Sequence, residues 1–191
     1  MAEFVLTVMS KDRPGIIAGL TEALFQIGGN VDELSQTVMG EYFTVILSAT
    51  FPDAVDADAV RSAAAESGAP GELDVAVSRK TPAAQAKPGV ASQGTFILTV
   101  MGKDQPGTIY QFSSYLAKKN INIIDCYAMA KEGRFNMILE VQIPRGVDIP
   151  EMQSEINWLG VEMGFAAHLQ HENIFIATND PRPVRIAPVA L

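Results

Sequence analysis

The chain has 191 residues, 48% of them hydrophobic and 19% charged, so it can bury a hydrophobic core in each of two domains. Its 14 basic and 22 acidic residues give a net charge of -8, which disfavours nucleic acid as a partner because phosphate binding depends on clustered Lys and Arg. A single cysteine excludes an intrachain disulfide, and no apolar run reaches the roughly 18 residues of a membrane span. With no signal-peptide pattern at the start, we expect a cytoplasmic protein without a membrane partner.

A strand, a turn and a helix open the predicted fold. Phe4–Met9 is rich in residues that favour β structure, and Pro14 and Gly15 end it in a turn. Apolar residues then recur every three or four positions, the period of one helical face, until Gly28 and Gly29 end the helix.

Two strands, a second helix and a closing strand follow. Asn30–Met39 and Tyr42–Phe51 are predicted to form a hairpin around a short Gly-Glu turn. The alanine-rich segment Asp53–Ser67 is predicted to be a helix, and Glu72–Arg79 a strand. The order βαββαβ places two helices on one face of a four-stranded antiparallel sheet, the ferredoxin-like arrangement.

The same order then recurs at a constant offset of 92 residues, since FVLTVMSKDRPG at Phe4–Gly15 returns as FILTVMGKDQPG at Phe96–Gly107. The second copy is predicted to have a strand at Thr95–Met101, a helix at Pro106–Lys119, strands at Ile121–Ala130 and Arg134–Ile143, a helix at Ile149–Met163 and a strand at His168–Ala177. We therefore predict an α+β protein of two tandem ferredoxin-like domains.

The predicted domains are residues 1–79 and 95–178, joined by a linker at 80–94 that is rich in Pro, Gly, Ala and Ser. Residues 179–191 carry three prolines and are predicted to form an extended C-terminal tail. Because the first strand is apolar at nearly every position, we expect the helix-free face of the sheet to be covered by the sibling domain or by a second chain. A homodimer is the expected assembly.

The repeated Asp-x-Pro-Gly turn is the feature that points to a binding site. The first N–H groups of a helix have no intrahelical acceptor, and the helix dipole adds positive charge there, so the turn can hold an anion. Gly15 and Gly107, expected at the second helical position, would let a carboxylate approach the backbone closely. Asp12 and Asp104 precede the turn and offer acceptors for an ammonium group. Together these groups suit a free α-amino acid.

Asn30 and Asn122 begin the second strand of each copy and add a donor and an acceptor at a constant spacing from the turn. A purely structural interpretation also holds, because Asp before Pro-Gly is a common helix N-cap and Asn before a strand is a common turn residue.

These motifs resemble those of the ACT domains, regulatory βαββαβ modules that commonly bind amino acids. The resemblance rests on DRPGI at Asp12–Ile16, DQPGT at Asp104–Thr108, GGNV at Gly28–Val31 and NINI at Asn120–Ile123. The tandem layout and the ending LQHENIFIA at Leu169–Ala177 resemble the group that contains the glycine cleavage system transcriptional repressor.

The resemblance implies two ligand pockets, in each of which the turn of one domain faces the second-strand asparagine of the other. The candidate ligand-binding residues are Asp12, Arg13, Gly15, Ile16, Asn122 and Ile123 for one pocket, and Asp104, Gln105, Gly107, Thr108, Asn30 and Val31 for the other.

The favoured function is a non-enzymatic sensor that binds a small amino acid and acts through a protein partner, with transcriptional control of glycine metabolism as the output that the resemblance implies. The alternative is a regulatory subunit of an amino-acid-metabolism enzyme on a separate chain. We expect no catalytic residues, because no nucleophile–base pair is visible. We expect neither a metal nor a cofactor, since His168 and His171 are three residues apart and would point to opposite faces of a strand.

Overall fold

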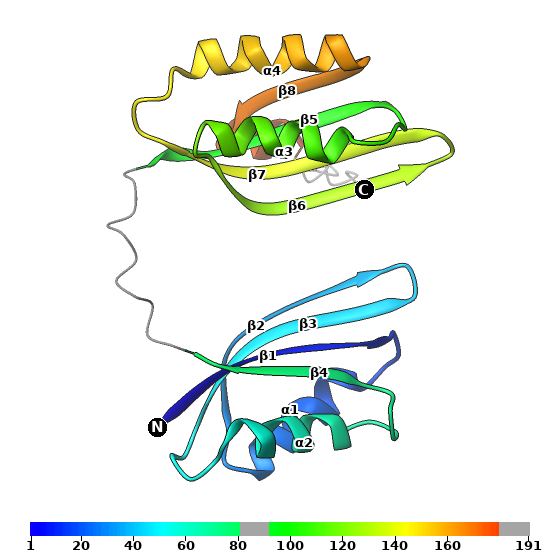
Figure 1. The fold of residues 1–191 in the computed structure, drawn as a ribbon, viewed down its shortest axis with the longest axis vertical. Helices are drawn as coiled ribbons and strands as arrows, with labels where there is room; N and C mark the ends of the chain where they lie inside the picture. Colours follow the sequence, from blue (N-terminus) through cyan, green and yellow to red (C-terminus); the bar gives the residue numbers. More distant parts are fainter. Residues whose placement is uncertain (81–91, 180–191) are drawn as a thin grey trace, which may run out of the picture. The chain divides into compact units, whose positions relative to one another are not determined.

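The computed structural model describes residues 1–80 and 92–179. The chain divides into two compact units, Met1–Gln85 and Ala86–Leu191 (Figure 1). Most of the predicted linker and nearly all of the predicted tail lie outside the described residues.

The first domain follows the predicted βαββαβ order. Its elements are β1 (Ala2–Lys11), α1 (Ile16–Gln26), β2 (Asn30–Met39), β3 (Tyr42–Phe51), α2 (Ala57–Glu66) and β4 (Asp74–Arg79). The strands form one antiparallel sheet in the order β2-β3-β1-β4, and both helices lie on the same face of that sheet (Figure 1).

Every second side chain along the central strands β1 and β3 points into the hydrophobic core of the first domain. Leu6 and Val8 of β1 are fully buried and face the same side as Leu47 of β3. Leu20 and Leu24 of α1, one helical turn apart, pack onto them. Each buried leucine contributes roughly 1.5–3 kcal/mol by leaving water, so this apolar stripe fixes α1, and with it the turn before α1, on the sheet.

The second domain repeats the architecture and adds one helix. Its elements are β5 (Ser92–Lys103), α3 (Thr108–Lys118), β6 (Asn122–Lys131), β7 (Arg134–Pro144), α4 (Ile149–Met163), β8 (Phe165–His171) and α5 (Glu172–Asn179). The sheet order is β6-β7-β5-β8, the same as in the first domain. The prediction of two tandem ferredoxin-like domains is confirmed.

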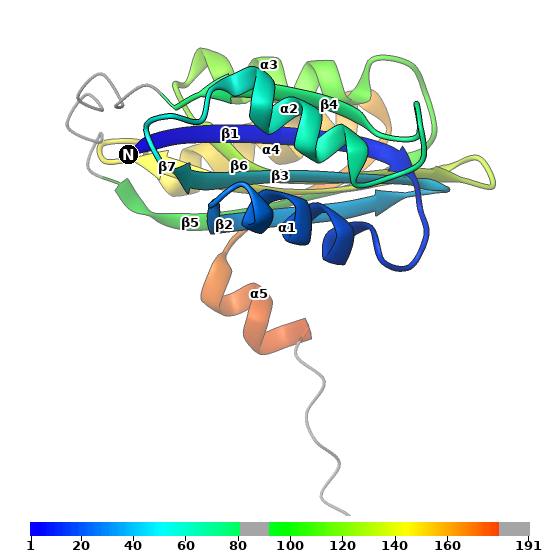
Figure 2. The same cartoon turned by 90° about the horizontal axis from the view of Figure 1, so that it is seen from below.

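The predicted strand at His168–Ala177 is wrong in both position and length. Gly164 ends α4 in the left-handed region at φ 74°, so β8 begins directly after it and covers Phe165–His171. Pairing with β5 ends at His171, and the rest of the segment forms α5. This helix contacts β5 and β8 and lies outside the two-layer part of its domain (Figure 2).

Candidate functional site

The two Asp-x-Pro-Gly turns have the same backbone geometry. Gly15 and Gly107 are the N-cap residues of α1 and α3, with φ of 90° and 88°. The expectation that they occupy the second helical position is therefore wrong, because the helices begin at Ile16 and Thr108. Glycine reaches this left-handed conformation without the steric penalty of a side chain, which explains why it follows the proline in both turns.

Neither aspartate caps its helix. Among the described residues no side chain accepts a hydrogen bond from the start of α1 or α3, whereas α2 and α4 are capped by Asp56 and Asp148 at 2.8 and 3.0 Å. Asp12 and Asp104 are exposed, and no hydrogen bond or ion pair of their carboxylates occurs within the described ranges. The capping interpretation of the motif is not realised.

The turns leave their helix-start N–H groups without acceptors. Pro14 and Gly15 form a turn that directs the Ile16 N–H towards Arg13 O, whereas in residues 1–80 the backbone N–H groups of Ile17 and Ala18 make no hydrogen bond. The next donor, Gly19 N, bonds Gly15 O at 2.9 Å. Two consecutive free donors at the positive end of a helix form a site for a carboxylate or another small anion.

A backbone hydrogen bond ties each turn to the neighbouring hairpin. Asp12 N donates to Glu41 O at 2.8 Å, and Asp104 N donates to Gly133 O at 2.9 Å. Both acceptors lie in the turn between the second and third strands of their domain. The aspartates are thus held in place by their backbone, which leaves the carboxylates free for another role.

A side chain ties the first turn to the loop after α2 and the second turn to the end of α4. Arg13 Nε and Nη2 donate to the two carboxylate oxygens of Glu72, the second at 3.0 Å. These bonds, together with one from the backbone N–H of Ala69, lower the pKa of Glu72 to about 2. In the second domain Gln105 Nε2 donates to Met163 O at 2.5 Å. Arg13 and Gln105 therefore shape the turns, and both side chains are already engaged.

The asparagines lie at the opposite end of each sheet from the turn. Asn30 is opposite Thr50, which pairs with Glu3 near the start of β1, while the turn follows Lys11 at the end of β1. Eight residues of strand correspond to about 27 Å. Asn122 has the same place in the second domain, opposite Gln142, which pairs in turn with Thr95 of β5. Within one domain the turn and the asparagine do not meet, so a shared site needs two domains, and their pairing stays a prediction.

The two asparagines have different surroundings. Asn30 Nδ2 donates to Asp32 Oδ1 at 2.9 Å. Asn122 lines a hollow of about 250 Å³ together with Asn120, Gln142 and Pro144. The copies therefore do not present their asparagines in the same way.

The remaining candidates have side chains in or near the cores. Ile16 and Thr108 are only 4% and 2% exposed, and the Thr108 hydroxyl donates to Gln105 O at 3.1 Å. Val31 and Ile123 are partly buried against their cores. Ile16 and Thr108 therefore do not present their side chains to a ligand at the turns.

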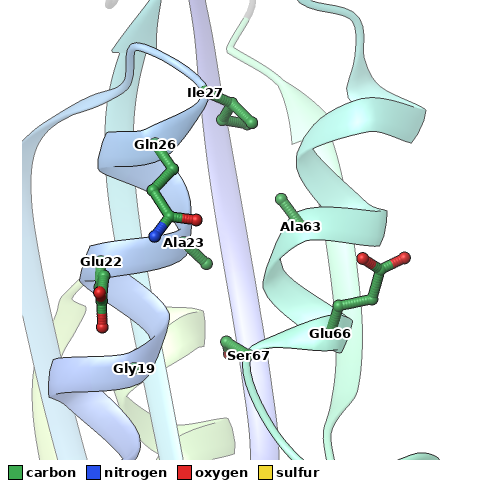
Figure 3. A pocket seen from close by; sticks show the side chains of 8 residues that line it. All are labelled: Gly19, Glu22, Ala23, Gln26, Ile27, Ala63, Glu66 and Ser67. Carbon is green, nitrogen blue, oxygen red and sulfur yellow. The ribbon is translucent and has the colours of Figure 1, made fainter.

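A separate groove of about 420 Å³ runs between α1 and α2 (Figure 3). The helices approach closely at Gly19, where an added Cβ would lie 3.1 Å from Ser67 O. Figure 3 shows Gln26 directed towards the groove, while the Glu66 carboxylate points away from α1. None of the predicted site residues lines this groove.

Two further features bear on chemistry. Within residues 1–80 and 92–179 no three His, Cys, Asp or Glu side chains form a metal-binding cluster, and no helix there is long and apolar enough to cross a membrane. Cys126 is exposed as a residue, but its thiol is partly shielded from water. This shielding and the nearby charge of Asp125 raise the pKa of the thiol, which disfavours the reactive thiolate.

The comparisons with known proteins agree with this architecture. The ACT domain model matches residues 3–78 and again 94–170. A UPF0237 protein of Methanococcus maripaludis is 36% identical over 80 residues, which cover 41% of this chain and 89% of that protein. A UPF0237 protein of Listeria innocua is 35% identical over 82 residues, 42% of this chain and 92% of that protein. Each relative therefore has about the length of one of the two domains.

Two solved structures share the tandem fold. An uncharacterised protein from Galdieria sulphuraria has a TM-score of 0.71 at 23% identity, covering 89% of this chain and 98% of its own. A protein provisionally assigned as a glycine cleavage system transcriptional repressor has a TM-score of 0.67 at 20% identity, covering 88% and 96%. The repeated match over most of the sequence and the repeated fold lead to one conclusion: this chain belongs to the ACT domain family and carries two ACT domains in tandem.

Proposed function

We propose that the chain is a non-enzymatic sensor that binds a small amino acid at its Asp-x-Pro-Gly turns and passes the binding event to a protein partner. The observation that carries this proposal is the pair of uncapped helix starts. In both domains two consecutive helix-start N–H groups have no acceptor in the described residues, and an aspartate carboxylate without a partner there precedes them. The N–H groups suit the ligand's carboxylate, and the aspartate suits its ammonium group.

The asparagines enter the proposal as the second half of each site. Asn122 would complete the site at Asp12, and Asn30 the site at Asp104, with the other domain supplying the asparagine in each case. This arrangement follows from the resemblance to the ACT family together with the separation of turn and asparagine within each sheet. The two sites would differ in affinity, because Asn30 is already hydrogen-bonded to Asp32, whereas Asn122 lines an open hollow.

The proposed output is a change in affinity for a protein partner. If the amino acid changes the chain's affinity for the partner by a given factor, thermodynamic linkage requires the partner to change the chain's affinity for the amino acid by the same factor. Structural likeness to a protein provisionally assigned as a glycine cleavage repressor favours transcriptional control as the pathway. Capture of a metabolic enzyme instead of a transcription factor would favour the alternative of a regulatory subunit.

A thermal-shift panel of the twenty amino acids tests the proposal. A ligand at a hundred times its dissociation constant should stabilise the protein by about 2.7 kcal/mol. Asp12→Ala and Asp104→Ala should each reduce the shift while leaving the unliganded melting temperature unchanged. A panel without any shift, or shifts that both variants retain in full, would refute the proposed function.

A further inference from the structure

We propose that the first domain holds a second, distinct site for a small α-amino acid on the helix-free face of its sheet. A hollow of about 240 Å³ lies there over β1, β2 and β3. Its lining residues are Val5, Glu33, Ser35, Ile46, Leu47, Ser48 and Lys80. The proposal does not depend on ligand binding at the Asp-x-Pro-Gly turns, because none of the turn residues lines this hollow.

Strand register brings the polar residues of the hollow together. Ser48 of β3 lies opposite Glu33 of β2 on one side and Val5 of β1 on the other, so the three form one row across the sheet. Ser35 and Ile46 form the next row on the same face, two residues along each strand. A carboxylate, two hydroxyls and two aliphatic side chains therefore share one small surface.

Ser48 supplies the observation that points to a ligand. Its hydroxyl oxygen is buried and has no hydrogen-bond partner within the described residues. A buried hydroxyl without a partner is unfavourable, and such groups in folded proteins are usually satisfied by the protein, by water or by a bound molecule. A polar ligand in the hollow would satisfy it.

The charges around the hollow match a zwitterion. Glu33 forms no ion pair or hydrogen bond through its carboxylate in residues 1–80, so it can accept from an ammonium group. Lys80 Nζ lies 3.3 Å from Glu3 Oε2, and its side chain is 47% exposed. An ammonium group has three donors, so Lys80 can bind a carboxylate besides Glu3. Val5 would meet a short aliphatic side chain of the ligand.

The volume restricts the ligand to small amino acids. A hollow of about 240 Å³ holds on the order of eight water molecules at about 30 Å³ each. Glycine, alanine and serine fit that space, whereas an aromatic side chain would project from it.

The second domain provides an internal comparison in which the site is lost. At the offset of 92 residues, Glu140 replaces Ser48 and lies opposite Ile97, just as Ser48 lies opposite Val5. Glu172 replaces Lys80, directly after the last residue of the closing strand. This face therefore lacks the cation and carries an extra carboxylate, so it would repel the carboxylate of an amino acid. The proposed site belongs to the first domain alone.

Calorimetric titration of the full chain tests the site, with glycine, L-alanine and L-serine as probes. Asp12→Ala/Asp104→Ala serves as the background, since it removes the aspartates proposed for the turns. In that background Ser48→Ala should weaken binding roughly tenfold, because it removes one hydrogen bond to a charged ligand group. Ser48→Glu, which imports the residue of the second domain, should abolish binding, and the matched control Glu140→Ser should leave it unchanged.

Two analogues of alanine test the zwitterion itself. Propionate lacks the ammonium group and ethylamine lacks the carboxylate, so each should bind at least tenfold more weakly than alanine. Ethylamine binding as tightly as alanine would overturn the assignment of Lys80, and propionate doing so would overturn that of Glu33.

The outcomes separate this site from the turns. Absence of binding in the background variant, or binding that Ser48→Glu does not change, overturns the proposed second site. Equal binding stoichiometry with and without the two turn aspartates would refute binding at the turns while leaving the second site standing. The melting temperature of Ser48→Ala should equal or exceed that of the unmodified chain, since the substitution removes an unsatisfied hydroxyl.

Discussion

Alanine substitution of four aspartates at helix starts should divide them into two classes. Asp56 caps α2 through a 2.8 Å bond to Ala59 N, and Asp148 caps α4 through a 3.0 Å bond to Glu151 N. Asp12 and Asp104 precede α1 and α3 but cap neither. The four residues therefore test directly whether the motif aspartates serve the fold.

The structure sets the expected magnitudes. Loss of an aspartate N-cap costs about 1 kcal/mol, so Asp56→Ala and Asp148→Ala should each destabilise their domain by roughly that amount. For a domain of this size, about 1 kcal/mol corresponds to a fall of roughly 4–8 °C in melting temperature. Asp12→Ala and Asp104→Ala should stay within about 0.5 kcal/mol of the unmodified chain, as is usual for exposed positions without partners.

Urea and thermal unfolding of the full chain, followed by circular dichroism, measure both classes under the same conditions. Comparing Asp12 with Asp56, and Asp104 with Asp148, keeps each comparison within one domain. Equal destabilisation by Asp12→Ala and Asp56→Ala would refute the reasoning, because the turn aspartate would then be serving as a cap.

Two further substitutions probe the packing at the end of α1 and the ion pair at the first turn. Gly29→Ala should destabilise the first domain by about 1–3 kcal/mol in urea unfolding, because its Cβ would lie 2.4 Å from a ring carbon of Phe51. Gly133→Asn is the control, since a Cβ there would meet nothing within 4 Å and asparagine tolerates the positive φ. A similar loss of stability in Gly133→Asn would contradict the explanation. Glu72→Gln should lower the free energy of unfolding near pH 7 but not in acid. The pKa of Glu72 is about 2 in the folded protein, against an ordinary value of 4.5, so its pair with Arg13 stabilises the fold fully above pH 4.5. This stabilisation disappears as the pH falls towards 2. Unfolding curves from pH 7 to pH 2 check this, and a difference between Glu72→Gln and the unmodified chain that grows on acidification would contradict it.

The strand and helix boundaries that could be predicted were those marked by local signals. The hairpin Asn30–Met39 and Tyr42–Phe51 agrees with β2 and β3, because Gly40 in its turn adopts φ 64°. The helix Ile149–Met163 also agrees, because Asp148 caps its start and Gly164 ends it. Where turn glycines and capping residues mark the ends of an element, the sequence alone predicts those ends.

Features set by long-range contacts could not be predicted in the same way. The apolar run after His171 suits either a strand or a helix, and only the end of pairing with β5 decides for α5. The tie between Arg13 and Glu72 spans 59 residues, and no local pattern indicates it. The turns were found from their repetition, but whether their aspartates cap the helices depends on side-chain placement. The unpartnered Ser48 emerges only from the sheet register.

The most direct test of the central claim is a titration of isotopically labelled full chain with the amino acid that gives the largest thermal shift, followed by backbone amide resonances. The N–H signals of Ile17, Ala18, Ile109 and Tyr110 should show saturable shifts, because these helix-start donors gain a carboxylate as acceptor. The same signals should stay unmoved by an amine that lacks the carboxylate. Saturable binding that leaves all four amide signals in place would contradict the claim that the uncapped helix starts hold the ligand.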